Sequence, residues 1–144
     1  MLNPEKIKVL VVEDNPDDIT IIKRAMRKSE VKCELSFAYD GEEALNFLHR
    51  EGEYEDAPKP DLILLDLNLP KIGGLEILDK IKQDEKLRRI PVIVLTISER
   101  EEDMIRAYDS GAASFMTKPV DSKDFERLIQ TVQDYWRIAR LPTE

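Results

Sequence analysis

Four short apolar runs, separated by longer segments with helical periodicity, constrain the fold of this chain more than any other feature. The runs cover residues 7–12, 62–67, 92–95 and 115–116. They are almost continuously hydrophobic, which is typical of strands that helices cover on both faces. A further segment, 35–39, alternates apolar and polar residues and predicts a strand at the edge of a sheet.

Segments with helical spacing follow these predicted strands. Asn15 and Pro16 have the residue types of a helix N-cap and a first helical position, and apolar residues recur behind them at three- and four-residue steps. Asp40 and Glu43 have the spacing of a capping box, in which two side chains cap one helix N-terminus reciprocally. Both positions therefore predict helix starts.

Two more helices are predicted toward the C-terminus. Ser98 and Glu101 repeat the capping-box spacing, and Gly111 is placed to end the helix that they begin. The last helix carries an apolar stripe over residues 125–139 that must pack against another part of the molecule. Within that stripe, Tyr135 and Trp136 are interpreted mainly as core residues, with a contact to a kinase or a second copy as the alternative.

The chain thus reads as five units of strand followed by helix. Helical crossovers between successive strands require a parallel sheet with helices on both faces. The sequence predicts a doubly wound α/β fold with five parallel strands and five helices. With 144 residues, the chain has the size of one domain, which we expect to span residues 1–144 with its core at about 6–140.

Composition excludes several function classes. The chain has 30 acidic and 22 basic side chains, and a net charge of −8 disfavours binding to the phosphate backbone of nucleic acids. Its one cysteine, Cys33, cannot form an internal disulfide or a multi-cysteine zinc site. No segment approaches the roughly 20 apolar residues that cross a bilayer, and the N-terminal MLNPEKIK lacks the apolar stretch of a signal peptide. We therefore expect a cytoplasmic protein that binds neither nucleic acid nor membrane.

Polar residues at the strand ends are the functional candidates, because doubly wound folds bind ligands at the carboxyl ends of their strands. These residues are Glu13, Asp14, Asp66, Thr96 and Lys118, with Pro119 directly after the lysine. Carboxylates brought together repel one another unless a cation joins them, and a small hard ion such as Mg²⁺ suits oxygen ligands. The set therefore predicts a Mg²⁺ site.

The same residues suit phosphoryl transfer, which depends mainly on alignment and on neutralising the charge of the phosphoryl oxygens. An aspartate is already ionised at neutral pH and can accept the group directly as an acyl phosphate. Asp66 is the best candidate, because the apolar residues on both sides of it argue against an ordinary surface aspartate. Each of the other residues alone is common at a strand end without a function, so the inference depends on their joint occurrence.

Four motifs carry a specific resemblance: VLVVEDNPDD, LILLDLNLPKIGG, VIVLT and SFMTKP. In series they resemble response-regulator receiver domains, the family that includes chemotaxis regulators, and the match covers nearly the whole chain. The resemblance implies a flavodoxin-like strand order of 2-1-3-4-5. It also implies a two-component phosphorelay, in which a histidine kinase supplies the phosphoryl group and a protein partner receives the signal.

The resemblance assigns roles residue by residue. Asp66 matches the phosphoacceptor, Glu13 and Asp14 match the acidic pair that positions Mg²⁺, and Asn68 matches a position that gives its backbone carbonyl to the metal. Thr96 and Lys118 match the hydroxyl and the ammonium that bind the phosphoryl group. Phe115 matches an aromatic switch that turns inward with Thr96, and Lys118-Pro119 matches a cis peptide bond. The face formed by the fourth helix, fifth strand and fifth helix would then be the signalling surface, where a homodimer can form.

Two residues depart from the family pattern. Ile97 stands where a small residue is usual, which predicts narrower access to Asp66, and Phe115 lacks the hydroxyl of the frequent tyrosine. The connection over residues 50–60 is long. Together with LRRIPVIVLT and DYWRIARLP, it resembles the small stand-alone receivers that serve phytochrome-type histidine kinases.

Two other functions use related folds. A phosphatase of the haloacid-dehalogenase type also has a strand-end aspartate and Mg²⁺, but its second acid lies two residues on, where this chain has Asn68. A flavodoxin-like ligand-binding module needs a glycine-containing phosphate cradle, and the first turn here, EDNPDD, is acidic and lacks glycine. Both rank below the receiver. The single histidine, His49, lies on a polar helix and is assigned no function.

Overall fold

The computed structural model describes residues 6–28 and 33–139, which form five strands and five α-helices in alternation. The strands are β1 (Ile7–Val12), β2 (Cys33–Ala38), β3 (Leu62–Leu65), β4 (Val92–Thr96) and β5 (Ser114–Thr117). The helices are α1 (Pro16–Lys28), α2 (Gly41–His49), α3 (Gly74–Gln83), α4 (Glu101–Asp109) and α5 (Ser122–Ile138), with a short 3₁₀ helix, η1 (Gly52–Tyr54), after α2.

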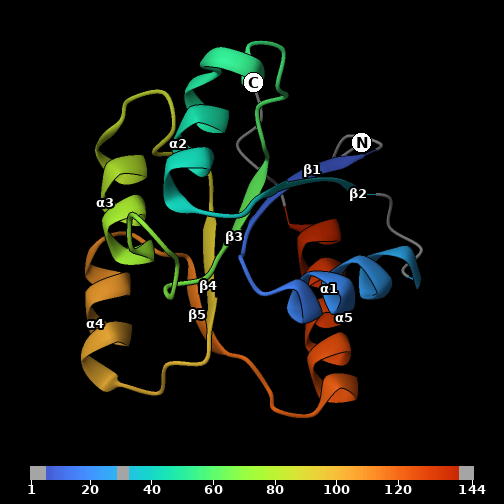
Figure 1. The fold of residues 1–144 in the computed structure, drawn as a ribbon. Coiled ribbons are helices and arrows are strands. Elements are labelled where there is room, and N and C mark those ends of the chain that lie inside the picture. Colours follow the sequence, from blue (N-terminus) through green and yellow to red (C-terminus); the bar gives the residue numbers. More distant parts are fainter. Residues whose placement is uncertain (1–5, 29–32, 140–144) are drawn as a thin grey trace.

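The strands pair in parallel in the order β2-β1-β3-β4-β5, which confirms the predicted doubly wound, flavodoxin-like sheet. β2, whose sequence alternates, lies at one edge, as expected. Helices α2, α3 and α4 cover one face of the sheet, and α1 and α5 cover the other (Figure 1). Of the helices in the described ranges, none is long and apolar enough to span a membrane.

Two hydrophobic clusters lie on opposite faces of the sheet and explain the continuous apolar runs. Along β1, Val9 and Val11 pack with the α1 and α5 residues, whereas Leu10 and Val12 pack with the residues of α2, α3 and α4. Successive side chains of a strand point to opposite faces, so a strand covered on both faces must be apolar at every position. The predicted core stripe of α5 is buried only in part, because Tyr135 is 60% exposed.

Most helix ends agree with the sequence. The Asn15 side chain accepts hydrogen bonds from the Asp17 and Asp18 backbone N–H groups at 2.9 and 3.2 Å and so caps α1. Asp40 caps α2 by accepting the Glu43 N–H at 2.8 Å. In a capping box the Glu43 carboxylate would accept the backbone N–H of Asp40. Here it accepts the N–H of the preceding residue, Tyr39.

The prediction that Ser98 caps a helix is wrong. Helix α4 begins at Glu101 with Arg100 at its N-cap, and the Ser98 hydroxyl instead donates to Asp103 Oδ2 at 2.7 Å. A serine after a strand can satisfy its hydroxyl within the loop as well as at a cap. Gly111 follows α4 with φ at +105°, which confirms the predicted stop. The expected end of the core at residue 140, and the end of the DYWRIARLP segment, lie outside the described residues.

Candidate functional site

The predicted site residues meet at the carboxyl edge of the sheet. Glu13 directly follows β1, Asp66 follows β3, Thr96 ends β4 and Lys118 follows β5. All four side chains are buried, and the relative exposure of the residues does not exceed 7%. Burying charged groups is unfavourable unless they are paired. The arrangement therefore depends on direct contacts among these residues.

Lys118 supplies those contacts. Its Nζ atom lies 2.8 Å from Glu13 Oε1 and 3.1 Å from Asp66 Oδ2, so one ammonium joins the ends of β1, β3 and β5. The other oxygen of the Asp66 carboxylate, Oδ1, accepts the backbone N–H of Asn68 at 3.2 Å. Both oxygens of the Asp66 carboxylate therefore have a partner, the Asn68 N–H for Oδ1 and the Lys118 ammonium for Oδ2.

Asp18 belongs to the same cluster, although the sequence did not single it out. Its Oδ2 atom lies 2.8 Å from Lys118 Nζ, which places a third carboxylate on the same ammonium. Asp18 lies in the first turn of α1, where acidic residues are common because they favour the positive end of the helix dipole. No sequence signal separates that ordinary role from a contact with the site.

The electrostatics of the cluster follow from its burial. Loss of solvation raises the pKa of Glu13 to about 7, although its hydrogen bond with Lys118 opposes the shift. Burial alone would lower the pKa of Lys118. Hydrogen bonds to Asp18 and Glu13 and the charges of Asp66 and Glu13 together outweigh burial and raise that pKa, which keeps the ammonium charged.

The acidic residues fit a divalent cation. Oxygens of Glu13, Asp14 and Asp66 all lie within 4.8 Å of one another, and Asp14 is exposed where the other two are buried. Carboxylate oxygens opening to water on one side suit an ion such as Mg²⁺, which keeps part of its hydration shell. Thr96 Oγ1 lies beside the cluster and accepts from Asn68 Nδ2 at 3.4 Å and from the Ser98 N–H at 3.3 Å. Among residues 6–28 and 33–139 the Thr96 O–H donates no hydrogen bond, so it is available as a donor.

Gly74 positions the Asp66 turn, although it was not among the predicted site residues. The Gly74 N–H donates to the Leu67 carbonyl at 3.0 Å, and a Cβ atom at this position would overlap the Asp66 carbonyl oxygen and Leu67 Cα. The neighbouring Gly73 has open space where its Cβ would be. Position 74, unlike position 73, therefore needs glycine for α3 to begin directly against the turn that carries Asp66.

The expectation of a cis bond between Lys118 and Pro119 is wrong, because no peptide bond among the described residues is cis. The two isomers of an X–Pro bond differ by only about 0.5–1 kcal/mol, with trans favoured. In the trans form Lys118 already reaches Glu13 and Asp66.

Phe115 is half-buried against the cluster under α2, α3 and α4, and its N–H donates to Tyr108 Oη at 3.1 Å. Ile97 is 67% exposed.

Comparison with known proteins identifies the family. The model of the response regulator receiver domain matches residues 9–132. The response regulator Rcp1 of Synechocystis sp. is 42% identical over 134 residues, which cover 93% of this chain and 90% of that protein. The probable methanogenesis regulatory protein FilR2 of Methanothrix harundinacea is 38% identical over 129 residues, covering 89% of this chain and 82% of that protein.

Solved structures agree. The Mn²⁺-bound form of Rcp1 superposes with a TM-score of 0.92 at 40% identity, covering 95% of this chain and 99% of that one. The phosphorylated cyanobacterial phytochrome response regulator RcpA superposes with a TM-score of 0.93 at 42% identity, covering 96% of this chain and 99% of that one. The strand order, the carboxyl-edge cluster and these matches lead to one conclusion: the chain belongs to the response regulator receiver domain family.

Proposed function

We propose that this chain is a stand-alone response regulator of a two-component phosphorelay in the cytoplasm, with Asp66 as the phosphoacceptor. The observation that carries the proposal is the cluster at the carboxyl edge. Asp66 is buried, and its Oδ2 lies 3.1 Å from Lys118 Nζ. Carboxylate oxygens of Asp66, Glu13 and Asp14 lie within 4.8 Å of one another. The family membership supports the same chemistry.

In the proposed reaction, an Asp66 carboxylate oxygen attacks the phosphorus of a phosphohistidine on the kinase. The new O–P bond forms as the N–P bond breaks, and the electron pair returns to the histidine nitrogen. The Asn68 N–H and Lys118 hold the two Asp66 oxygens during this step. Mg²⁺, held by Glu13, Asp14, Asp66 and the Asn68 carbonyl, would neutralise the phosphoryl oxygens.

Phosphorylation changes what Lys118 and Thr96 can bind. In the structure, Lys118 contacts three carboxylates, whereas a phosphoryl group on Asp66 offers it oxygens with greater charge. We infer that Lys118 moves to those oxygens and that Thr96 donates its hydroxyl to another. Phe115 would then turn inward as the space beside Thr96 changes, which alters the face formed by α4, β5 and α5.

That face is the proposed signalling surface. It carries exposed apolar side chains, including Ile105 at 51%, Tyr108 at 48% and Tyr135 at 60% exposure. We propose that its partners are a downstream protein or a second copy of this chain. Similarity to the cyanobacterial phytochrome response regulator RcpA supports a phytochrome-type histidine kinase as the phosphoryl donor.

Phosphorylation with a small donor tests the proposed acceptor. Incubation with acetyl phosphate and Mg²⁺ should add one phosphoryl mass to the intact chain, and chelation by EDTA should prevent the addition. Asp66→Asn should gain no mass, whereas Asp109→Asn, a change at an exposed position on α4, should behave like the parent. Full modification of Asp66→Asn would assign the acceptor elsewhere.

The dimer is tested separately. Beryllofluoride mimics a phosphoryl group on aspartate, so its addition with Mg²⁺ should increase the mass measured by light scattering if the face formed by α4, β5 and α5 associates. Tyr135→Glu should prevent that increase without changing acetyl phosphate labelling. An unchanged mass would leave a different protein as the receiver of the signal. We propose no turnover of other substrates, since Asn68 occupies the place of a phosphatase's second acid.

A further inference from the structure

A second charged site lies at the end of the sheet opposite Asp66. A pocket of about 820 Å³ opens between the end of α2, the connection over residues 50–60 and the loop from α3 to β4. The α3–β4 loop enters β4 at its amino end, so the pocket lies toward the edge of the sheet opposite the Asp66 cluster. The residues that line it are Leu48, His49, Arg50, Lys59, Asp84, Glu85, Lys86, Leu87 and Arg89.

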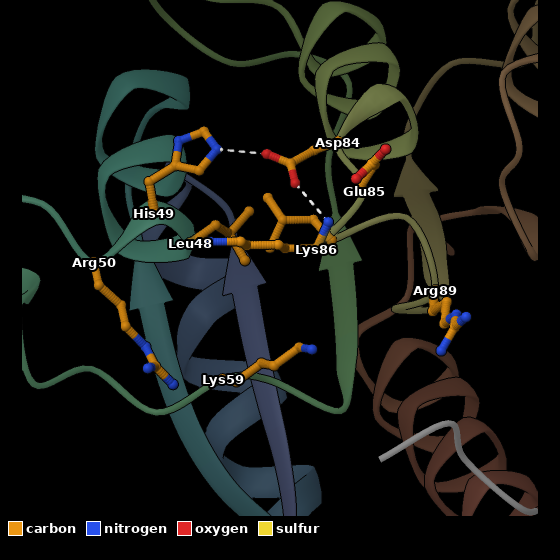
Figure 2. Close-up of a pocket in the computed structure, with 9 residues that line it drawn as sticks. Leu48, His49, Arg50, Lys59, Asp84, Glu85, Lys86 and Arg89 are labelled. Carbon is orange, nitrogen blue, oxygen red and sulfur yellow. Dashed lines mark hydrogen bonds and ion pairs between the residues drawn. The ribbon is translucent and has the colours of Figure 1, made fainter. Parts of the chain in front are cut away.

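The lining is cationic in a protein whose net charge is −8. Four of its side chains are basic, namely Arg50, Lys59, Lys86 and Arg89, and two are acidic, Asp84 and Glu85. Figure 2 shows Arg50, Lys59 and Lys86 extending around the pocket from three separate segments. A local excess of cations on an acidic protein creates a potential that favours an anionic partner at this place.

In the part of the chain that the structure describes, the Asp84 carboxylate forms no ion pair with Arg50, Lys86 or Arg89, because it contacts other groups. One oxygen lies 3.1 Å from His49 Nε2, and the other accepts the Lys86 backbone N–H at 2.8 Å (Figure 2). These contacts join the end of α2 to the α3–β4 loop and fix the two sides of the pocket. Within the described residues, the side chains of Arg50, Lys86 and Arg89 form no ion pair with a carboxylate.

The backbone at Arg50 gives a second reason to regard the pocket as a binding site. Arg50 ends α2 with φ at 56° and ψ at 44°, in the left-handed region where glycine is usual. A strained non-glycine residue is a reason to suspect a function. Here the strain places a guanidinium at the rim of the pocket.

We propose that this pocket binds an acidic peptide segment of a partner protein, as an interaction site separate from the phosphorylation site. A compact phosphate group prefers a tight cradle of backbone N–H groups, usually with glycines. This pocket instead presents long cationic side chains from segments far apart in the sequence, around an open space that accommodates several side chains. Positive charges that are separated in this way are complementary to carboxylates that recur along an extended peptide.

Binding of a fluorescein-labelled octaglutamate peptide to the full chain tests the proposal, with octaglutamine as the neutral control. A protein of net charge −8 should repel octaglutamate unless a local site attracts it. We expect saturable binding by fluorescence anisotropy that weakens as salt is raised, and no binding of octaglutamine. The backbone amide NMR signals of residues 48–50, 59 and 84–89 should shift during the titration. Absence of binding, or shifts confined to the Asp66 cluster, would overturn the proposal.

Charge-reversal variants localise the site. Arg50→Glu combined with Lys86→Glu should weaken octaglutamate binding at least about tenfold, because both changes replace attraction with repulsion at the pocket. Arg27→Glu reverses one exposed charge on α1, outside the pocket, and should change the affinity less than about twofold at moderate salt. Circular dichroism checks that each variant is folded. Equal losses in all variants, or equally tight binding of a labelled oligothymidylate, would show general polyanion attraction and reject a peptide site.

Discussion

Charged residues gather at both ends of the parallel strands, but their surroundings differ. At the carboxyl edge, Glu13, Asp66 and Lys118 are buried and in direct contact. At the opposite edge, Arg50, Lys86 and Arg89 are exposed around an open pocket. Buried charges depend on one another, because removal of one leaves the others unpaired in a poorly solvated place. Exposed charges act almost independently. Substitutions at the carboxyl edge should therefore affect one another strongly, whereas the effects of substitutions around the pocket should add.

Removal of the shared ammonium should have the largest effect. Lys118→Met keeps most of the side-chain volume but leaves Glu13, Asp18 and Asp66 without their cation. We expect the free energy of unfolding in EDTA at pH 8 to fall by about 3–5 kcal/mol in urea titrations. Lys71→Met is the control, since Lys71 is exposed and contacts two carboxylates, on Asp40 and Glu42, where Lys118 contacts three. The Lys71 variant should lose about 0–1 kcal/mol. Equal losses would contradict the distinction between the edges.

Metal and protons should each restore part of the stability lost in Lys118→Met. Mg²⁺ replaces the missing positive charge, so it should raise the unfolding midpoint of the variant more than that of the parent. The pKa of Glu13 is raised to about 7 from its usual 4.5, so its protonation favours the folded state below that range and the contribution is lost as pH rises through about 7. The variant should therefore lose less stability at pH 5.5 than at pH 8. A deficit independent of both pH and Mg²⁺ would indicate lost packing alone.

The turn under Asp66 should be the next most sensitive place. Gly74→Ala forces a Cβ against the Asp66 carbonyl, and we expect a loss of about 1–3 kcal/mol from this overpacking. Gly73→Ala is the control, since its Cβ meets no atom and its φ is −68°. Gly73 is the N-cap of α3, where alanine is less favourable than glycine, and this cost opposes the gain of about 0.4–1 kcal/mol from restricting the unfolded chain, so the change should be close to neutral. Urea titration of both variants measures the contrast, and equal shifts would mean that α3 can move away from the turn.

The opposite edge should respond with the reverse sign. Arg50→Gly relieves a left-handed residue and should stabilise the protein by about 0.5–1 kcal/mol, while weakening octaglutamate binding. Arg27→Gly, in the last turn of α1, should instead destabilise, by less than the roughly 1 kcal/mol that glycine costs in a helix interior. Thermal unfolding and the anisotropy titration separate the two effects. A destabilised Arg50→Gly would show that the arginine supports the fold.

The smallest effect should come from Asp40, which is half-buried and follows β2 at the carboxyl edge. Asp40 accepts the Glu43 N–H, and this bond, with Lys71 contributing less, lowers the pKa of Asp40 below its usual 3.8. Its charge therefore stabilises the fold above that value, and the contribution is lost as pH falls through the lowered pKa. Asp40→Asn keeps the capping oxygen without the charge. It should cost at most about 0.5 kcal/mol at pH 7. The cost should shrink as pH falls through the lowered pKa, and a deficit unchanged at low pH would exclude the charge as its cause.

The site was predictable from the sequence to the extent that topology alone determines it. Four strands carry Glu13, Asp66, Thr96 and Lys118 at their carboxyl ends, and a parallel sheet brings these ends to one edge whatever path the loops take. Asp18 and Gly74 were not predictable, because their contacts depend on the path of the loops next to the strands. The isomer at Pro119 was not predictable either, since the two forms differ little in energy.

The fold shows the same division. Continuous apolar runs predicted the central strands, and the alternating segment predicted the edge strand β2. The N-cap at Ser98 failed because a hydroxyl near a strand end has several local partners. The pocket beside Arg50 had no sequence signal, because it joins residues 48–50, 59 and 84–89 across a long separation.

The most direct test of the central claim is the chemical identity of the phosphorylated residue. Borohydride reduces an aspartyl phosphate to homoserine, and peptide mass mapping locates that residue. After incubation with acetyl phosphate and Mg²⁺, we predict homoserine at position 66 in the parent chain, and none in EDTA. Homoserine at another position, or a phosphoryl group that withstands borohydride, would contradict the claim that the buried cluster makes Asp66 the acceptor.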